Sequence, residues 1–370
     1  MAPKRPKGAG AFPKPVESPA PSRPDPSELY AALDLGTNSC RMLIAQPKGN
    51  QFHVVDSFSK SVQLGAGLEK SGRLSRTSMN RTISALRVCQ QKLRRHDVSQ
   101  MRLVATEACR RALNSREFIH QVKRETGLNL EIIQPEEEAR LAVISCAPLV
   151  STKTEQLLVV DIGGGSTELV WIDLSAVPAF ERPRAIMRLH AGFHTKDSLF
   201  PAARVVDWIS VPWGVATLRD QFSDVESDSA RYALMSWFFE ENLTEFAPYK
   251  DEQAREGFQI VGTSGTVTTV AASHLGLKRY DRNKVDGLRM TSDQIEKVIS
   301  NYLHLGPEGR LRDPRIGSDR QALIMSGAAI LQALLRCWPT DRLSVADRGL
   351  REGLLYAQMS AAGVLEDGTY

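Results

Sequence analysis

The sequence lacks the features that would place it in a membrane or hold it together by disulfide bonds. It contains no run of 18 or more apolar residues, the length that a membrane-spanning helix needs. Its cysteines are odd in number, scattered and without a CxxC pair, which excludes a disulfide framework and a zinc site of the usual spacing. They are Cys40, Cys89, Cys109, Cys146 and Cys337. We interpret them as small core residues of a protein that works in the reducing cytoplasm.

The sequence also lacks a large excess of charge of one sign. The 47 Lys and Arg against 43 Asp and Glu leave a net charge of +4, which does not indicate a specific nucleic-acid partner. Part of this charge lies in residues 1–27, which are rich in proline and basic side chains. Such a segment cannot bury enough apolar surface to order itself, so we expect a disordered, solvated tail, with docking on a polyanion as the alternative. It has no apolar stretch typical of a secretory signal.

Aromatic residues are few, and five of them fall in one expected helix, Ser229–Phe246, which ends on the fifth. This helix carries Tyr232, Trp237, Phe238 and Phe239. Aromatic side chains at such spacing favour a core or an oligomer face over a platform on which bases stack.

Glycine, in contrast, is concentrated where chemistry is expected. The stretch Leu157–Trp171 reads as an apolar strand that ends in Asp161, three glycines (Gly163, Gly164 and Gly165), two hydroxyl residues, Glu168 and a second apolar strand. Bare backbone N–H groups beside a carboxylate suit phosphate and a divalent cation. A tight hairpin without ligands explains the same pattern, so the stretch alone leaves both interpretations open.

A second copy of this stretch favours the phosphate interpretation. Ala31–Ala45 aligns with it without a gap, so that Asp34 matches Asp161, Gly36 matches Gly163, Ser39 matches Ser166 and Arg41 matches Glu168. Repetition at a domain-sized spacing predicts two similar halves that face each other. At 370 residues the chain is long enough for two such domains.

A third glycine-rich element follows at Ile260–Ala272. It reads as a strand, then Gly262, Thr263, Ser264 and Gly265, then a helix. A strand that leads through glycines into a helix N-terminus is an anion-binding arrangement. We expect it to form the other wall of one phosphate pocket.

Between these elements the pattern predicts alternating strands and helices. Three further expected strands are Phe52–Phe58, Met101–Ala105 and Leu130–Ile133, and Ser115 and Gly127 are expected to cap a helix. Pro135 suits the first turn of the next helix, which opens with Glu136, Glu137 and Glu138. Acids in a first turn are favoured by the helix dipole, so this position alone does not tell which of them reaches a substrate.

Two short patterns with histidine, one His-Asp doublet and one pair of histidines, do not indicate a metal site. His96 and Asp97 have no complementary histidine cluster, and Gly192 between His190 and His194 weakens a helical metal pair. We expect these histidines to be core or surface residues.

Six motifs in order carry a resemblance to a known family. They are DLGTNSCR, VATEACRRALN, EEEARL, DIGGGSTE, VGTSGT and GLREGLL. Together they resemble the exopolyphosphatase and guanosine pentaphosphate phosphohydrolase (Ppx/GppA) family from Leu29 to the C-terminal helix. The resemblance implies an α/β protein with the duplicated ribonuclease-H-like fold of actin, sugar kinases and chaperone ATPases, in which two lobes enclose a cleft. We expect the first lobe at residues 28–137, the second at 138–349, and a C-terminal helix at about 350–366 that packs back on the first.

The resemblance also implies roles for particular residues. Glu138 is then the base that activates water, and Arg110 binds phosphate. Asp161 and Glu138 are implied near a magnesium ion or another divalent cation. The implied phosphate-binding residues are Asp34, Gly36, Asn38, Ser39, Arg41, Gly163, Gly164, Gly165, Ser166, Glu168, Gly262, Ser264, Gly265 and Arg320. The family's usual Arg-Ala-Asp is Arg320-Gln321-Ala322 in this sequence, a departure at that position.

The implied activity is release of terminal orthophosphate from polyphosphate, or conversion of guanosine pentaphosphate to tetraphosphate, by a homodimer in the cytoplasm. Longer family members append a further phosphohydrolase-like domain, and from chain length we expect short polyphosphate to be favoured. Two alternatives stay open at this point: an actin-type ATPase or kinase, and a non-catalytic protein that binds the alarmone nucleotide. The set Glu138, Arg110 and Asp161 argues against a pure binder, which has no use for a base.

Overall fold

Two sheets of the same topology organise the chain. The computed structural model describes residues 27–189, 193, 202–250, 257–317 and 320–365. The first sheet is formed by β1 (Tyr30–Leu35), β2 (Ser39–Lys48), β3 (Gln51–Ser61), β4 (Gln100–Ala105) and β5 (Glu131–Ile132) in the order β3-β2-β1-β4-β5. β1 pairs antiparallel with β2 and parallel with β4.

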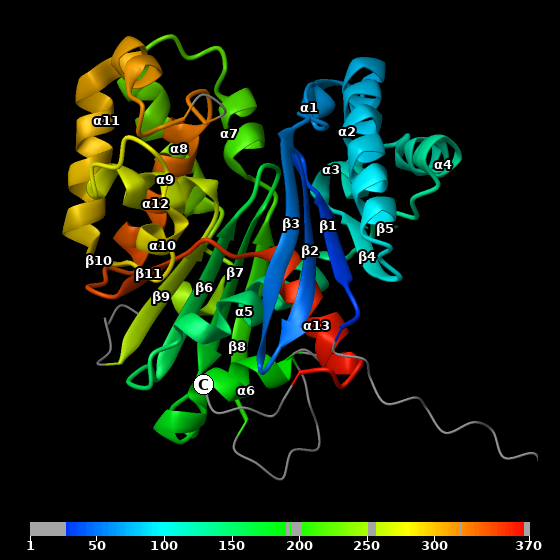
Figure 1. The fold of residues 1–370 in the computed structure, drawn as a ribbon. Coiled ribbons are helices and arrows are strands. Elements are labelled where there is room, and N and C mark those ends of the chain that lie inside the picture. The colour runs from blue at the N-terminus through cyan, green and yellow to red at the C-terminus, as the bar shows by residue number, and fades with distance from the viewer. Residues whose placement is uncertain (1–26, 190–192, 194–201, 251–256, 318–319, 366–370) are drawn as a thin grey trace, which may run out of the picture.

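The second sheet repeats this order with a second set of strands. It is formed by β6 (Gln156–Ile162), β7 (Thr167–Asp173), β8 (Arg204–Val211), β9 (Phe258–Thr263), β10 (Arg289–Met290) and β11 (Leu343–Ala346) in the order β10-β11-β9-β6-β7-β8. β6 pairs antiparallel with β7 and parallel with β9, as β1 does with β2 and β4. The repetition confirms the predicted duplicated, two-lobed actin-type fold (Figure 1).

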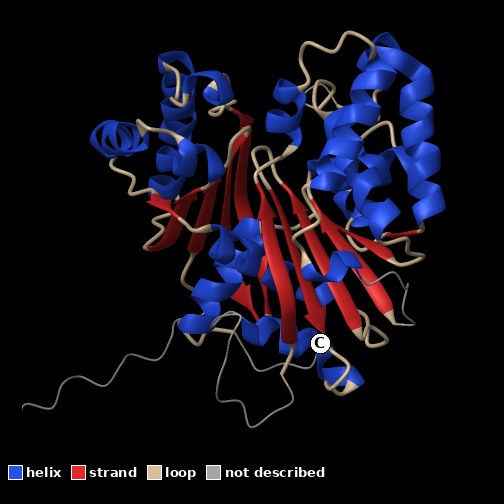
Figure 2. Cartoon of the chain, turned by 180° about the vertical axis from the view of Figure 1, so that it is seen from behind, coloured by secondary structure: helices blue, strands red, loops and turns tan. Residues whose placement is uncertain are grey.

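Helices surround both sheets (Figure 2). Those of the first half are α1 (Leu68–Ser71), α2 (Arg76–Arg95), α3 (Glu107–Arg111), α4 (Ser115–Thr126) and α5 (Pro135–Cys146). Those of the second half are α6 (Arg182–Arg188), α7 (Val215–Gln221), α8 (Asp228–Glu241), α9 (Gly265–His274), α10 (Arg282–Val285), α11 (Ser292–Arg312), α12 (Ile324–Cys337) and α13 (Leu350–Ala361). In Figure 1, α2 and α4 lie beside the first sheet, and α8, α9, α11 and α12 lie beside the second.

The helices α5 and α13 lie where the two halves meet. Leu141 and Ile144 of α5 pack in one apolar cluster with β1 and α13. Val143 and Cys146, on the other face of α5, pack in a cluster with β6 and β7. Because 3.6 residues make one turn, these two pairs face opposite ways, and α5 fills the space between the sheets. A residue in the first turn of α5 is therefore held by both lobes.

A glycine lets α13 approach α5 closely. A Cβ on Gly353 would overlap the backbone carbonyl of Leu141, with the carbonyl carbon only 2.7 Å away. Backbone atoms cannot swing aside as a side-chain end can, so any larger residue would push α13 away from α5.

We therefore expect Gly353→Ala to lower the free energy of unfolding by about 1–3 kcal/mol, the usual range for overpacking. The direction of the change in unfolding free energy decides the test, because a glycine-to-alanine change inside a helix otherwise stabilises a protein by about 0.5–1 kcal/mol. Urea unfolding of the two proteins measures the difference. A more stable variant would contradict the close approach of the two helices.

Some local predictions need correction. Asn114, and not Ser115, is the N-cap of α4, while Gly127 ends that helix as expected. The aromatic helix is Asp228–Glu241, shorter than expected because Asn242 ends it. Its aromatic residues divide as helical geometry requires: Phe239 is fully buried, whereas Trp237 is 59% exposed.

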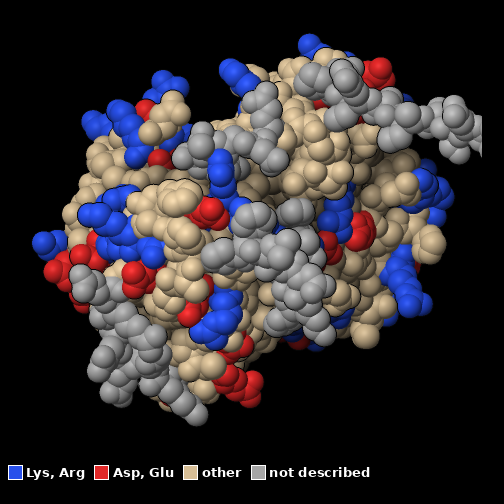
Figure 3. Space-filling model, turned by 90° about the horizontal axis from the view of Figure 1, so that it is seen from below, with Lys and Arg blue, Asp and Glu red and all other residues tan. Residues whose placement is uncertain are grey.

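Several expectations fall outside the described residues, namely the tail at 1–26 and the pair His190 and His194. Among the described residues, no helix is long and apolar enough to cross a membrane. Basic and acidic side chains are interspersed over the face shown in Figure 3. A polyanion would therefore find no large basic patch among the described residues of that face.

Candidate active site

The two predicted hairpins have the same turn. In each, the N–H of the first glycine donates to a serine carbonyl three residues later: Gly36 to Ser39 at 2.9 Å and Gly163 to Ser166 at 2.9 Å. In each, the aspartate lies opposite the seventh residue after it, which is Arg41 for Asp34 and Glu168 for Asp161. The two turns thus have the same backbone conformation, but the residue opposite the aspartate is basic in one and acidic in the other.

The two hairpins contact each other across the cleft. A Cβ on Gly164 would lie 3.2 Å from the backbone nitrogen of Asn38. One on Gly165 would overlap the Thr37 hydroxyl and lie 2.9 Å from Cγ of Glu107. The glycines after Gly163 therefore have a packing role, because only residues without a side chain let the two loops come this close.

The third glycine-rich element forms another wall. Ser264 caps α9, and its hydroxyl accepts hydrogen bonds from the N–H groups of Thr266 and Val267 at 3.1 Å each. Arg320 lies against this helix start, where its Nη1 donates to the Gly265 carbonyl and to the hydroxyl of Thr269 at 3.0 Å.

Glu138 is the acid of the EEE run that lies at the cleft. Glu136 is exposed, and Glu137 pairs with Arg102 at 2.7 Å. Glu138 pairs with Arg110, whose Nη1 donates to its Oε2 at 2.7 Å. The structure thereby separates three residues that the sequence pattern alone left equivalent.

Arg110 is held by protein groups on every side of its guanidinium. It donates to Glu138, to Glu107 Oε2 at 2.9 Å and to the Ile133 carbonyl at 3.0 Å. Its side chain does not line the cavity. In this arrangement Arg110 orients Glu138, and the implied contact of Arg110 with phosphate stays a prediction.

One cavity of about 170 Å³ collects most of the residues predicted as site residues. Its lining includes Asp34, Gly36, Asn38, Ser39, Arg41, Glu138, Asp161, Gly163, Gly164, Gly165, Ser166, Ser264, Gly265 and Arg320. Three predicted residues do not line the cavity: Arg110, Glu168 and Gly262. Segments far apart in the sequence thus meet at one place.

The carboxyl groups of this site resist ionisation. Burial, followed by the charge of Glu168, raises the pKa of Glu138 well above its ordinary value, although Arg110 opposes the shift. Burial and the neighbouring Glu138 raise the pKa of Asp161 to about 8. Burial and Asp161 raise the pKa of Glu168 to about 7. Burial also raises the pKa of Asp34, against the effect of Arg41.

These oxygen donors fit a divalent cation in chemical type. A cation beside Asp34, Glu138 and Asp161 would relieve a repulsion that the protein itself does not fully neutralise. Among the described residues no group of three or more His, Cys, Asp or Glu is already arranged to hold a metal ion. Mg²⁺ does not require such a group, because it commonly takes one or two carboxylates and completes its shell with water and substrate phosphate.

The sequence interpretation missed part of the cavity wall. Among the missed polar residues are Thr37, Thr106, Glu107, Asp347, Arg348 and Arg351. A signal was present for Arg351, since GLREGLL opens a helix with the charged pair Arg351 and Glu352 shortly after a short strand. Thr37 and Glu107 belong to recognised motifs, but their places at the lobe contact depend on packing between distant segments.

The fold and the cavity define a two-lobed actin-type protein with a glycine-lined cleft, and the largely buried carboxylate of Glu138 lies at its wall. The family model of the Ppx/GppA phosphatase family matches residues 43–362. The chain therefore belongs to the Ppx/GppA phosphatase family, which indicates a hydrolase.

Solved structures agree with this assignment. The Aquifex aeolicus member of the Ppx/GppA family is 30% identical, with 90% of this chain and 98% of that chain covered and a TM-score of 0.69. The type II variant of the Aquifex aeolicus Ppx/GppA phosphatase is 31% identical over 90% and 99% of the two chains, with a TM-score of 0.66. An exopolyphosphatase from Cytophaga hutchinsonii shares the fold at 21% identity, with 92% and 100% covered and a TM-score of 0.74.

Proposed function

We propose that this protein hydrolyses the terminal phosphoanhydride bond of inorganic polyphosphate or of guanosine pentaphosphate. The observation that carries the proposal is Glu138, a buried carboxylate at the wall of a glycine-lined cavity whose pKa is raised well above the ordinary value. A raised pKa makes a carboxylate a stronger proton acceptor near neutral pH. A protein that only binds an anion gains nothing from placing such a group there.

In the proposed mechanism Glu138 orients a water molecule and takes its proton as the water attacks the terminal phosphorus. Arg110 holds the Glu138 carboxylate in place through the 2.7 Å hydrogen bond. The N–H groups of the glycine turns and the start of α9 stabilise the charge that grows on the phosphoryl oxygens. Orthophosphate leaves with the attacking oxygen, and the shortened polyanion keeps the bridging oxygen.

We also propose that the site takes Mg²⁺. Asp161 and Glu138 would hold it, with Asp34 nearby. When bound, it would neutralise charge on the substrate's phosphoryl oxygens.

A thermal-stability experiment tests the metal without relying on activity. Because the pKa of Asp161 is raised to about 8, the folded protein holds a proton there at pH 6 and loses it at pH 8.5. The charged group is unfavourable in the folded state, so stability without metal falls as pH rises through this range. We expect Mg²⁺ to raise Tm by several degrees at pH 8.5 and much less at pH 6, where protons compete.

NaCl of equal ionic strength serves as the control for screening, and Asp161→Asn as the control for the site. The variant should lose most of the shift at pH 8.5. An equal Mg²⁺ shift in the wild type and in Asp161→Asn would rule out this carboxylate as a ligand.

A kinetic comparison tests the function itself. We expect purified protein with Mg²⁺ to release orthophosphate from polyphosphates of different length or from guanosine pentaphosphate, with a measurable kcat/KM. ATP should be a much poorer substrate. The ranking of the values across the series identifies the preferred substrate, and turnover confined to ATP would instead support an actin-type ATPase.

A further inference from the structure

The start of α13 reaches the same cavity as Glu138. Residues 346–351 line it, directly after β11 of the second sheet. α13 itself packs on α5 and β1. Since Gly353 approaches the Leu141 carbonyl, the N-terminal halves of α5 and α13 lie close together, and Glu138 belongs to one and Arg351 to the other. The floor of the cleft is thus made of two helix starts.

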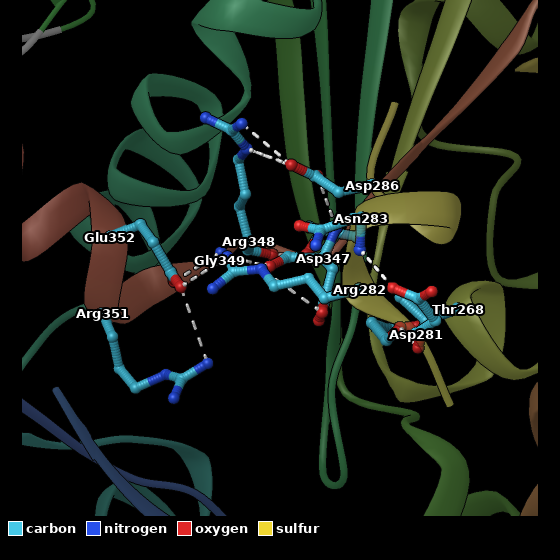
Figure 4. Close-up of polar contacts among 12 residues, drawn as sticks. Thr268, Asp281, Arg282, Asn283, Asp286, Asp347, Arg348, Gly349, Arg351 and Glu352 are labelled. Atoms are coloured by element: carbon cyan, nitrogen blue, oxygen red, sulfur yellow. Dashed lines mark hydrogen bonds and ion pairs between the residues drawn. The ribbon is translucent and has the colours of Figure 1, made fainter. Parts of the chain in front are cut away.

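The residues just before Arg351 form hydrogen bonds and ion pairs with the α10 region. Arg348 pairs with Asp286 of the α10 region through contacts of 2.8 and 3.0 Å (Figure 4). Arg282 donates to the Asp347 carbonyl at 2.6 Å. These contacts fix the segment that crosses from the second sheet to α13.

Glu352 anchors the helix start on the other side. Its Oε2 accepts the Gly349 N–H at 2.9 Å, and its Oε1 lies 3.5 Å from Arg282. Glu352 is 3% exposed, so its carboxylate has little freedom to move. Arg351 touches it at 3.7 Å, longer than a hydrogen bond (Figure 4).

The guanidinium N–H groups of Arg351 are consequently available for hydrogen bonds. Among the described residues its guanidinium forms the 3.7 Å ion pair with Glu352 but no hydrogen bond. Arg41, on β2, lines the same cavity, and its buried Nε has no hydrogen-bond partner in the described part of the chain. Burial, and then the charge of Arg351, lowers the pKa of Arg41. The charges of Asp34, Asp161 and Glu352 lie near these guanidinium groups and offset part of their repulsion. They do not satisfy the N–H donors by hydrogen bonds, which an anion in the cavity would accept.

We propose that Arg351 joins Arg41, which the family resemblance already implies as a phosphate-binding residue, in the subsite that recognises the terminal phosphate of the substrate and, after hydrolysis, the orthophosphate product. The assignment rests on the proposed function. A terminal phosphate has one more ionisable oxygen than an internal one and carries a second negative charge near neutral pH. Two arginines beside the helix of Glu138 match this doubly charged end.

Glu352 acts in this proposal as a positioning residue. It holds the start of α13 and orients Arg351 towards the cavity without touching substrate. Glu352→Gln keeps an acceptor for the Gly349 N–H but removes the charge that faces Arg351.

The test measures binding of inorganic orthophosphate, by calorimetry and as a competitive inhibitor of polyphosphate hydrolysis. We expect Arg351→Gln to raise the orthophosphate dissociation constant about tenfold or more, as for loss of a charge-assisted hydrogen bond. Arg351→Lys should recover part of the affinity, since it keeps the charge but not the planar fork. Glu352→Gln should weaken binding by a smaller factor.

Arg282→Gln is the matched control. It removes the same charge and a partner of Glu352 and of the Asp347 carbonyl, but Arg282 does not line the cavity, so affinity should fall no more than in Glu352→Gln. A lower kcat for Arg351→Gln with unchanged orthophosphate affinity would overturn the proposal and indicate a structural role. A loss of affinity in Arg282→Gln equal to that in Arg351→Gln would overturn it as well. If the wild type binds orthophosphate yet hydrolyses no polyanion, the proposed function fails and the subsite does not.

Discussion

Glu138→Gln should lower kcat for phosphate release about a thousandfold, within the range of 10²–10⁴ that general base catalysis contributes. Glutamine has nearly the same shape and can still accept the hydrogen bond from Arg110, but it cannot take a proton from water. We expect KM to change little, because the glycine turns and the arginines of the cleft remain in place. Steady-state kinetics with the substrate that the wild type prefers measures both constants.

The same helix supplies two matched controls. Glu136→Gln and Glu137→Gln make the same chemical change, one on an exposed side chain and the other on a side chain that pairs with Arg102. Both should retain kcat within about a factor of two or three, because neither side chain lines the cavity. Full turnover by Glu138→Gln, or an equal loss in all three variants, would remove Glu138 from the mechanism.

Arg110→Met should have the second-largest effect, in stability and in pH dependence together. The change leaves Glu107 and Glu138 without their shared cation, and breaking a buried pair typically costs about 3–5 kcal/mol. It also removes the charge that lowers the pKa of Glu138, so that this pKa rises further. Because the base works only when ionised, activity is lost as pH falls through this pKa.

We therefore expect kcat/KM of Arg110→Met at pH 7 to fall about a hundredfold, with the acidic limb of the pH profile shifted upward and part of the activity regained at high pH. Urea unfolding establishes that the variant is folded at the assay temperature. Arg111→Met is the neighbouring control, since the hydrogen bonds of Arg111 go to Glu69 and only a longer ion pair of 3.8 Å joins it to Glu107, so it should alter the profile little. A loss confined to KM and independent of pH would instead make Arg110 a direct phosphate ligand.

Local patterns predicted the two hairpins and the start of α5. Asp34 and Asp161 could be aligned because each is followed by the same glycine turn, and the structure gives both turns the same hydrogen bond. Pro135 at the first position of α5 and Gly127 at the end of α4 are also as predicted, since both depend on neighbours within a few residues.

The parts that could not be predicted depend on contacts between distant segments. Three consecutive glutamates have the same local environment in the sequence, and only the approach of Arg110 from α3 distinguishes Glu138. The sequence motif predicts Gly165 only as a phosphate-binding residue. Its close contact with Thr37 of the other lobe depends on how the two loops pack. Arg351 is one of many charged residues at helix starts, and its place at the cleft follows from the packing of α13 on α5.

The central claim is that water, activated by Glu138, attacks the terminal phosphorus of a polyanion. Hydrolysis of that substrate in H₂¹⁸O, followed by mass spectrometry of the released orthophosphate, tests it most directly. We predict one ¹⁸O atom in each orthophosphate released by the wild type, none in the shortened polyanion, and almost no labelled product with Glu138→Gln. Label in the shortened polyanion, or undiminished labelling by the variant, would contradict the account.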